Sequence, residues 1–150
     1  MSTTTLTAVR DAVEDLIIGL TPAKPHERRT TFKKASGATD WPERIGSDFD
    51  REFTVEAITM NEPLFFGKTS ETDYNGQIEI IIGHTQTRDR RTGIIRRDED
   101  LQNIKENMEK SGNFPSGVSL MRSSGWESID IDKYWLTRMT FEIFVTLDSA

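Results

Sequence analysis

The stretch YWLTRMTFEIFVTLD, residues 134–148, decides the fold. Every second residue from Trp135 to Leu147 is apolar or threonine, which is the pattern of a β-strand that buries one face. The alternate residues are mostly polar, and no proline or glycine interrupts the run. We therefore expect a long strand at the centre of a sheet. Leu136 and Phe144 fall on its polar face, which hints that this face meets another chain.

Composition limits the classes of protein that are possible. The chain has 150 residues, which fits a single domain over 1–150, and its net charge is −6. It has no cysteine, which excludes disulfides and thiolate zinc sites. The N-terminus has no basic region followed by an apolar run, and apolar runs such as Ile80–Ile82 are only three residues long. These features predict no signal peptide, no membrane partner and synthesis in the cytoplasm.

The N-terminal half predicts one helix and several strands. Residues 5–20 carry apolar side chains at spacings of three and four, so we expect an amphipathic helix that packs on the sheet rather than binding a partner. Residues 27–34 could form an edge strand, because basic residues flank its apolar positions. Residues 49–60 and 77–84 alternate as strands. Asn75-Gly76 predicts a tight turn before the last of these, and hence antiparallel pairing.

The C-terminal half predicts a second helix over residues 98–111. Asp98 is expected as its N-cap, and Glu99 and Asp100 suit the positive end of the helix dipole, so capping explains these acids better than metal binding. A short strand around Val118 and Leu120 is expected to follow.

Residues 61–76 and 85–97 are expected to be mobile loops, and residues 123–133 a polar loop. The two acidic residues Asp130 and Asp132 are then expected in solvent. Strands that flank a packed helix favour an α+β fold, with a largely antiparallel sheet of four to five strands and two helices on one face.

The sequence offers no catalytic or cofactor motif. The histidines are His26 and His84, and neither has a second metal ligand at helical spacing, while His84 is expected as an ordinary residue at a strand end. No nucleophile motif or phosphate-binding glycine loop is present. We expect a protein that is not an enzyme, with no catalytic, cofactor-binding or metal-binding residues and no cofactor.

The densest basic cluster is the best functional candidate. It consists of Arg88, Arg90, Arg91, Arg96 and Arg97. Arginine suits phosphates and carboxylates equally, so this cluster could contact nucleic acid, dock on acidic surfaces of neighbouring subunits, or simply lie in solvent.

Four apolar residues complete the candidate subunit or partner interface. They are Phe65, Phe66, Leu136 and Phe144. The first two lie in the long connection between predicted strands, and the other two lie on the polar face of the final strand.

The order of elements resembles that of tail terminator (tail completion) proteins of long-tailed bacteriophages. The resemblance rests on the chain length, the opening helix from Leu6 to Leu20, and strands separated by a long loop. It continues with the capped helix DEDLQNIKENMEK (98–110), the short strand GVSLM (117–121) and the final strand RMTFEIFVTL (138–147). It covers most of the chain as an order of elements, while residues 21–48 depart from it.

The resemblance implies a structural virion protein at the tail–head junction, assembled in the host cytoplasm. Such proteins form a ring, commonly a hexamer, that caps the tail tube, ends its polymerisation and joins the tail to the head. The implied partners are other copies of the chain, the tail tube protein and a head or neck connector protein. Genome DNA would pass through the lumen without sequence recognition. The alternatives are a head-completion or stopper neck protein, and a small nucleic-acid-binding domain that uses the arginine cluster.

Overall fold

The computed structural model describes residues 3–20, 33–34, 51–61, 65–66, 71–86, 89–131 and 134–148. The helices are α1 (Leu6–Ile18) and α2 (Arg90–Met108), and a short 3-10 helix covers Ser111–Asn113. The long strands are β2 (Arg51–Met60), β4 (Glu71–Thr85), β5 (Val118–Ile131) and β6 (Tyr134–Asp148). Two very short strands, β1 (Lys33–Lys34) and β3 (Phe65–Phe66), complete the set.

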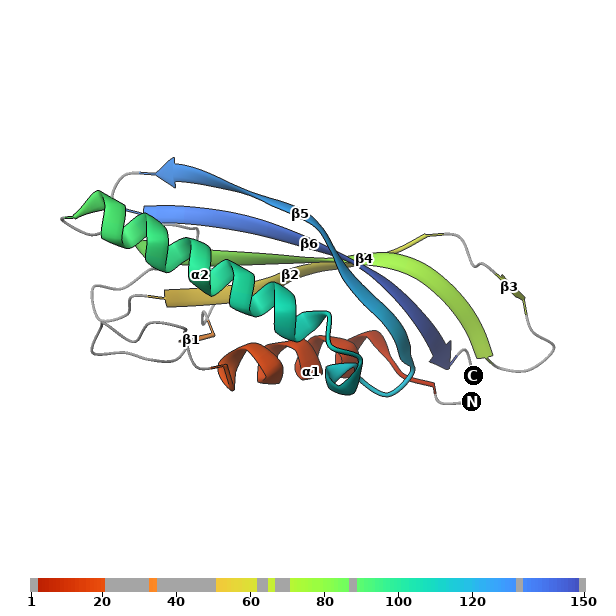
Figure 1. The fold of residues 1–150 in the computed structure, drawn as a ribbon. Helices are drawn as coiled ribbons and strands as arrows, with labels where there is room; N and C mark the ends of the chain where they lie inside the picture. The colour runs from red at the N-terminus through yellow and green to blue at the C-terminus, as the bar shows by residue number, and fades with distance from the viewer. Residues whose placement is uncertain are drawn as a thin grey trace.

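One sheet joins all of the strands, in the order β1-β2-β4-β6-β5, and β3 pairs with β4 beside this path. The long strands pair antiparallel, whereas β1 runs parallel to β2 at the edge. Both helices lie on one face of the sheet (Figure 1). The predicted α+β fold with a largely antiparallel sheet is therefore confirmed, and the residues expected to form an edge strand supply β1 at Lys33–Lys34.

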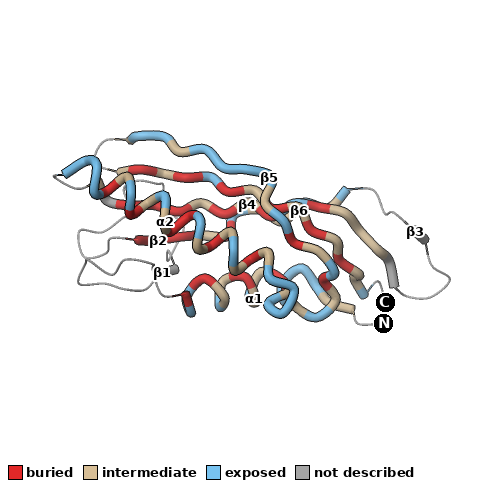
Figure 2. Tube along the Cα trace, viewed as in Figure 1, coloured by how far each residue is buried: buried red, intermediate tan, exposed pale blue. Residues whose placement is uncertain are grey.

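β6 is the central strand, as its sequence predicts. It pairs with β4 along its whole length, from Tyr134 opposite Thr85 to Asp148 opposite Glu71, and with β5 on its other side. The alternate residues from Trp135 to Val145 are buried under the helices, and Leu147 is half-buried. Figure 2 shows this alternation along β6 as red and tan segments. Leu136 and Phe144 lie half-buried on the opposite face.

The core lies between the sheet and the two helices. The Thr5 side chain caps α1 by accepting a hydrogen bond from the amide of Ala8 (3.1 Å). The buried face of α1 then repeats at helical spacing through Val9, Val13 and Ile17. α2 contributes Leu101, Ile104 and Met108, and the apolar face of the sheet includes Phe53, Ile78, Ile80, Ile82 and Phe141.

The expected turn at Asn75-Gly76 is wrong. Both residues lie inside β4, which begins at Glu71 rather than at residue 77, although the antiparallel pairing of β2 with β4 is confirmed. Gly76 lies opposite Met60, and a Cβ there would collide with the carbonyl oxygen of Thr59 and the Met60 side chain. The glycine allows a close approach of the strands rather than a change of chain direction.

The second helix begins earlier than expected. Asp89, not Asp98, is the N-cap, because its carboxylate accepts hydrogen bonds from the amide (3.5 Å) and hydroxyl (2.6 Å) of Thr92. These bonds lower the pKa of Asp89. Most of the expected loop at 85–97 is therefore helical, and Asp98-Glu99-Asp100 lies in mid-helix, so the capping explanation of these acids is wrong.

The expected polar loop at 123–133 is also wrong, because β5 continues to Ile131. Its register shifts between Ser123 and Gly125, and Gly125 has a φ of 119°, a conformation that favours glycine. Asp130 therefore lies on a strand, while Asp132 lies outside the described residues. The loop expected at 61–76 is shorter than predicted, because β4 begins at Glu71. Residues 62–64 and 67–70 lie outside the described part of the chain.

Candidate functional site

A buried polar cluster ties α2 to the sheet. Arg51 on β2 and His84 on β4 are register partners, and both side chains are buried. Asp100 reaches them from α2: its Oδ2 accepts a hydrogen bond from Arg51 Nε at 2.5 Å and lies 2.9 Å from His84 Nε2. The expectation that His84 is an ordinary strand-end residue is therefore wrong.

Burial lowers the pKa of His84 by more than the nearby Asp100 raises it. Arg51 and Arg96 lower the pKa further. His84 is therefore neutral at neutral pH. Because a carboxylate only accepts hydrogen bonds, the proton of the neutral ring is on Nε2, which donates to Asp100. The resulting arrangement is one buried ion pair with a neutral histidine beside it. Its three side chains are closed to solvent, so it orients α2 rather than presenting reactive groups.

A helical spacing points to this cluster. Arg96, Asp100, Ile104 and Met108 are all buried and follow one another at intervals of one helical turn. Two members of this stripe are charged, so a search for apolar periodicity misses them. A search for charged residues that extend an apolar helical stripe would have found Asp100.

The described members of the predicted arginine cluster do not form one exposed surface. Arg90 and Arg97 lie over the ring of Trp135, with their guanidinium carbons 5.8 and 5.4 Å from its centroid. Arg90 also forms an exposed ion pair with Asp130, at 2.9 Å. Arg96 is buried, whereas Arg91 is exposed. Arg88 lies outside the described residues.

Three of these arginines therefore make contacts within the chain or are buried. Arg90 and Arg97 join α2 to β6 through the buried Trp135, and Arg96 is on the buried face of α2. Of the described arginines in the cluster, Arg91 is the exposed one that does not lie over Trp135.

The apolar candidates lie apart from one another. Leu136 and Phe144 occupy opposite ends of the outer face of β6, which is the face away from the helices. Phe144 lines a hollow together with Tyr74 and Phe114. Phe65 and Phe66 form β3, opposite Asp73 and Thr72 of β4, and their side chains lie outside the description.

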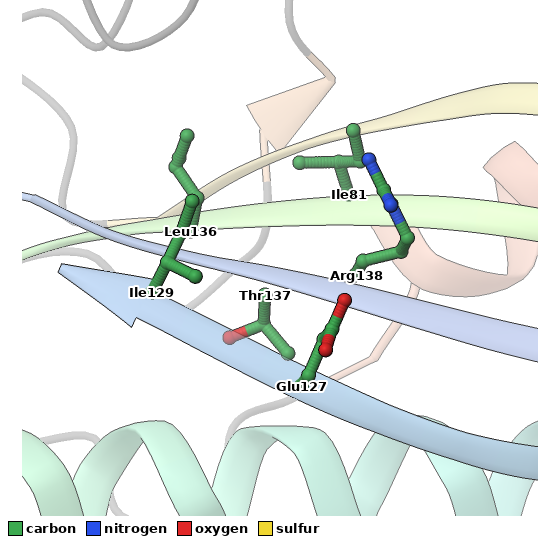
Figure 3. A pocket seen from close by; sticks show the side chains of 6 residues that line it. All are labelled: Ile81, Glu127, Ile129, Leu136, Thr137 and Arg138. Carbon is green, nitrogen blue, oxygen red and sulfur yellow. The ribbon is translucent and has the colours of Figure 1, made fainter. Parts of the chain in front are cut away.

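Leu136 lies in a shallow groove on the outer face, shown in Figure 3. Ile81 comes from β4, Leu136 and Arg138 from β6, and Glu127 and Ile129 from β5. The strand register places Leu136 beside Ile129, and Arg138 between Ile81 and Glu127. Arg138 also forms an ion pair with Glu79, at 3.3 Å.

Ile129 is the most exposed large apolar residue of the described chain, at 53%. It lies on the edge strand of the sheet, at the rim of the groove. The groove combines apolar side chains with charges of both signs, from Arg138 and Glu127. Sequence alone identifies Leu136 but not Ile81 or Ile129, because the register that joins them is a tertiary property.

In the described segments, no group of three or more histidine, aspartate or glutamate side chains could hold a metal ion. Over the same segments, no helix has both the length and the apolar character needed to cross a membrane. Comparison with models of known protein families gives no match, and comparison with curated proteins gives none either.

Proposed function

We propose that this chain is a structural virion protein of the bacteriophage tail–head junction. In this role it forms a ring, of six subunits by the resemblance, that caps the tail tube, ends its polymerisation and joins the tail to the head. The observation that supports the proposal best is the order of elements, α1-β2-β4-α2-β5-β6. It is the order on which the resemblance to tail terminator proteins rests.

The surface is compatible with a subunit that makes several contacts. Large apolar residues are exposed on three elements: Leu6 and Ile18 on α1, Ile95 on α2, and Ile129 on β5. The first three lie on the helices, which cover one face of the sheet, and Ile129 lines the groove on the other face, so copies or partners could contact both faces. Such contacts would be heterologous if they close a ring by rotation.

The nucleic-acid-binding alternative receives less support. Arg96 is buried, and Arg90 is engaged by Asp130 and Trp135, so the helix does not present the arginine cluster as one basic surface. If nucleic acid is nevertheless bound through Arg91 and its neighbours, binding should weaken steeply with salt.

Electron microscopy of the purified full-length protein, with and without tail tubes, tests the proposal. We expect rings, at least on the ends of tubes, and tails of uncontrolled length in particles that lack the protein. Normal tail length and normal head joining without the protein would refute the proposal. Labelling of the protein in intact particles separates a terminator, at the tube end, from a head-completion or stopper protein nearer the head.

A further inference from the structure

The outer edge of β5 has no partner strand among the described residues. β5 is the last strand in the sheet order and pairs on one side only, with β6. In Figure 1 it is the outermost strand over the part that ends in its arrowhead. An unpaired edge presents a row of backbone amides and carbonyls that can pair with another strand.

We call residues 126–131, sequence WESIDI, the edge segment. It follows the irregularity between Ser123 and Gly125 and contains no lysine or proline, although it carries two acidic residues, Glu127 and Asp130. Trp126 is 42% exposed and Ile129 53% exposed. The edge segment therefore has the features of a strand that is open to pairing.

The opposite edge of the sheet is partly covered. β1 pairs with β2 at Glu52 and Phe53. Just beyond, the guanidinium of Arg10 on α1 donates hydrogen bonds to the carbonyl oxygens of Val55 and Glu56. These β2 groups already have partners, whereas no strand pairs with the outer side of β5 in the described part of the chain, so β5 is the more open edge.

We propose that the edge segment is a docking site for the edge segment of a second copy of this chain, in a two-fold symmetric antiparallel pair. Such a pair is isologous, so it is distinct from the rotational contacts that would close a ring. The proposal therefore goes beyond the proposed function and does not depend on it.

The sequence of the edge segment suits pairing with itself about an axis at Ser128 or Ile129. With the axis at Ser128, Glu127 lies opposite Ile129 of the second copy; with the axis at Ile129, it lies opposite Ile131. Asp130 lies opposite Trp126 in the first register and opposite Ser128 in the second, so neither acid directly faces its own copy; the nearest like-charged pair is diagonal, about 7–8 Å apart. An axis at Glu127 or Asp130 would place like charges directly opposite each other, which is destabilising.

The groove continues across this pair. Ile129 lies beside Leu136 in the register, and Ile81 lines the same groove. A second copy would place its own Ile129 and Leu136 against this rim, so the two grooves would join into one apolar surface. Pairing would also shield Ile129, the most exposed large apolar side chain.

Disulfide trapping tests the pairing directly, because the chain has no cysteine of its own. We expect Ser128→Cys or Ile129→Cys to form a covalent dimer under mild oxidation. Directly opposed Cβ atoms in antiparallel strands are about 4.5–5.5 Å apart, about 1 Å more than in a disulfide, so a small movement of the strands allows the bond. Ser119→Cys is the matched control, because Ser119 is exposed near the other end of β5 and should stay uncrosslinked.

A charge substitution gives the second measurement. In sedimentation equilibrium, the native mass should rise from 17.1 kDa toward twice that value with concentration. Ile129→Lys should lose this doubling, whereas Ile18→Lys should retain it, because Ile18 is exposed on α1, away from the edge.

The proposal is overturned if Ser128→Cys and Ile129→Cys crosslink no better than Ser119→Cys, or if Ile129→Lys self-associates like the native chain. Circular dichroism confirms that each variant is folded. If the cysteine variants crosslink specifically and Ile129→Lys still forms rings, the pair and the proposed function both stand. Specific crosslinking without any ring on tail tubes would leave the pair intact and remove the proposed function.

Discussion

Arg51 and Asp100 are 49 residues apart in the sequence, yet Arg51 Nε lies 2.5 Å from Asp100 Oδ2 in the interior of the protein. Both side chains are almost completely shielded from water, and His84 shares the same carboxylate oxygen. Removing one partner from a buried pair leaves the other charge without compensation, which costs more than the pair itself contributes. This contact is therefore the point at which α2 is most sensitive to substitution.

Asp100→Asn should destabilise the protein by about 3–5 kcal/mol, because it keeps the shape of the side chain but removes the charge that faces Arg51. Urea unfolding followed by circular dichroism measures the change. Asp98→Asn is the matched control on the same helix: Asp98 is exposed, and we expect a change within about 0.5 kcal/mol. Similar midpoints for the two variants would show that the buried pair does not hold α2.

His84 should make stability fall as the solution becomes acidic. Unfolded His84 binds a proton near its ordinary pKa of 6.5, whereas burial lowers the pKa in the folded protein. Between pH 6.5 and the lower folded pKa, the unfolded state binds more protons, so stability falls with falling pH and is fully present above pH 6.5. The slope for one proton is at most about 1.4 kcal/mol per pH unit.

Comparison with His84→Gln isolates this effect. Glutamine has a side-chain amide that can donate to Asp100, but it does not titrate. We expect the difference in unfolding free energy between the native chain and the variant to narrow as pH falls below 6.5, the ordinary pKa of histidine. Parallel stability curves over that range would rule out His84 as the source of the acid sensitivity.

The elements that sequence predicts well are those whose burial is apolar and periodic. β6 has the predicted bounds of residues 134–148, and α1 differs from its prediction only at its ends. Both bury one face against the core, so the period of apolar residues carries the information.

The elements that sequence misses are stabilised in other ways. The first half of α2 buries Gly93 and Arg96 instead of an apolar stripe. β5 beyond Ser123 is an edge strand that is exposed on much of both faces, so it has no clear alternation. The candidate site depends on the strand register that joins Ile81, Leu136 and Ile129, which one sequence does not encode locally.

Gly76→Ala should destabilise the protein by about 1–3 kcal/mol, because the added methyl group must displace backbone where β2 and β4 approach closely. Gly112→Ala is the control, since a Cβ at that exposed position meets nothing within 4 Å. Thermal unfolding compares the two variants. An unchanged midpoint for Gly76→Ala would mean that β2 moves aside without cost, contrary to the close pairing of Met60 with Gly76.

Arg10→Met should destabilise the protein by about 1.5–3 kcal/mol, the usual range for hydrogen bonds that involve a charged group. Methionine retains much of the apolar stem that packs on the sheet but removes the donors to the Val55 and Glu56 carbonyls. Hydrogen exchange should also quicken in β2, because α1 no longer holds its edge. Arg91→Met, at an exposed position of α2, provides the control and should leave both stability and exchange nearly unchanged. Equal effects of the two substitutions would show that Arg10 does not protect the β2 edge.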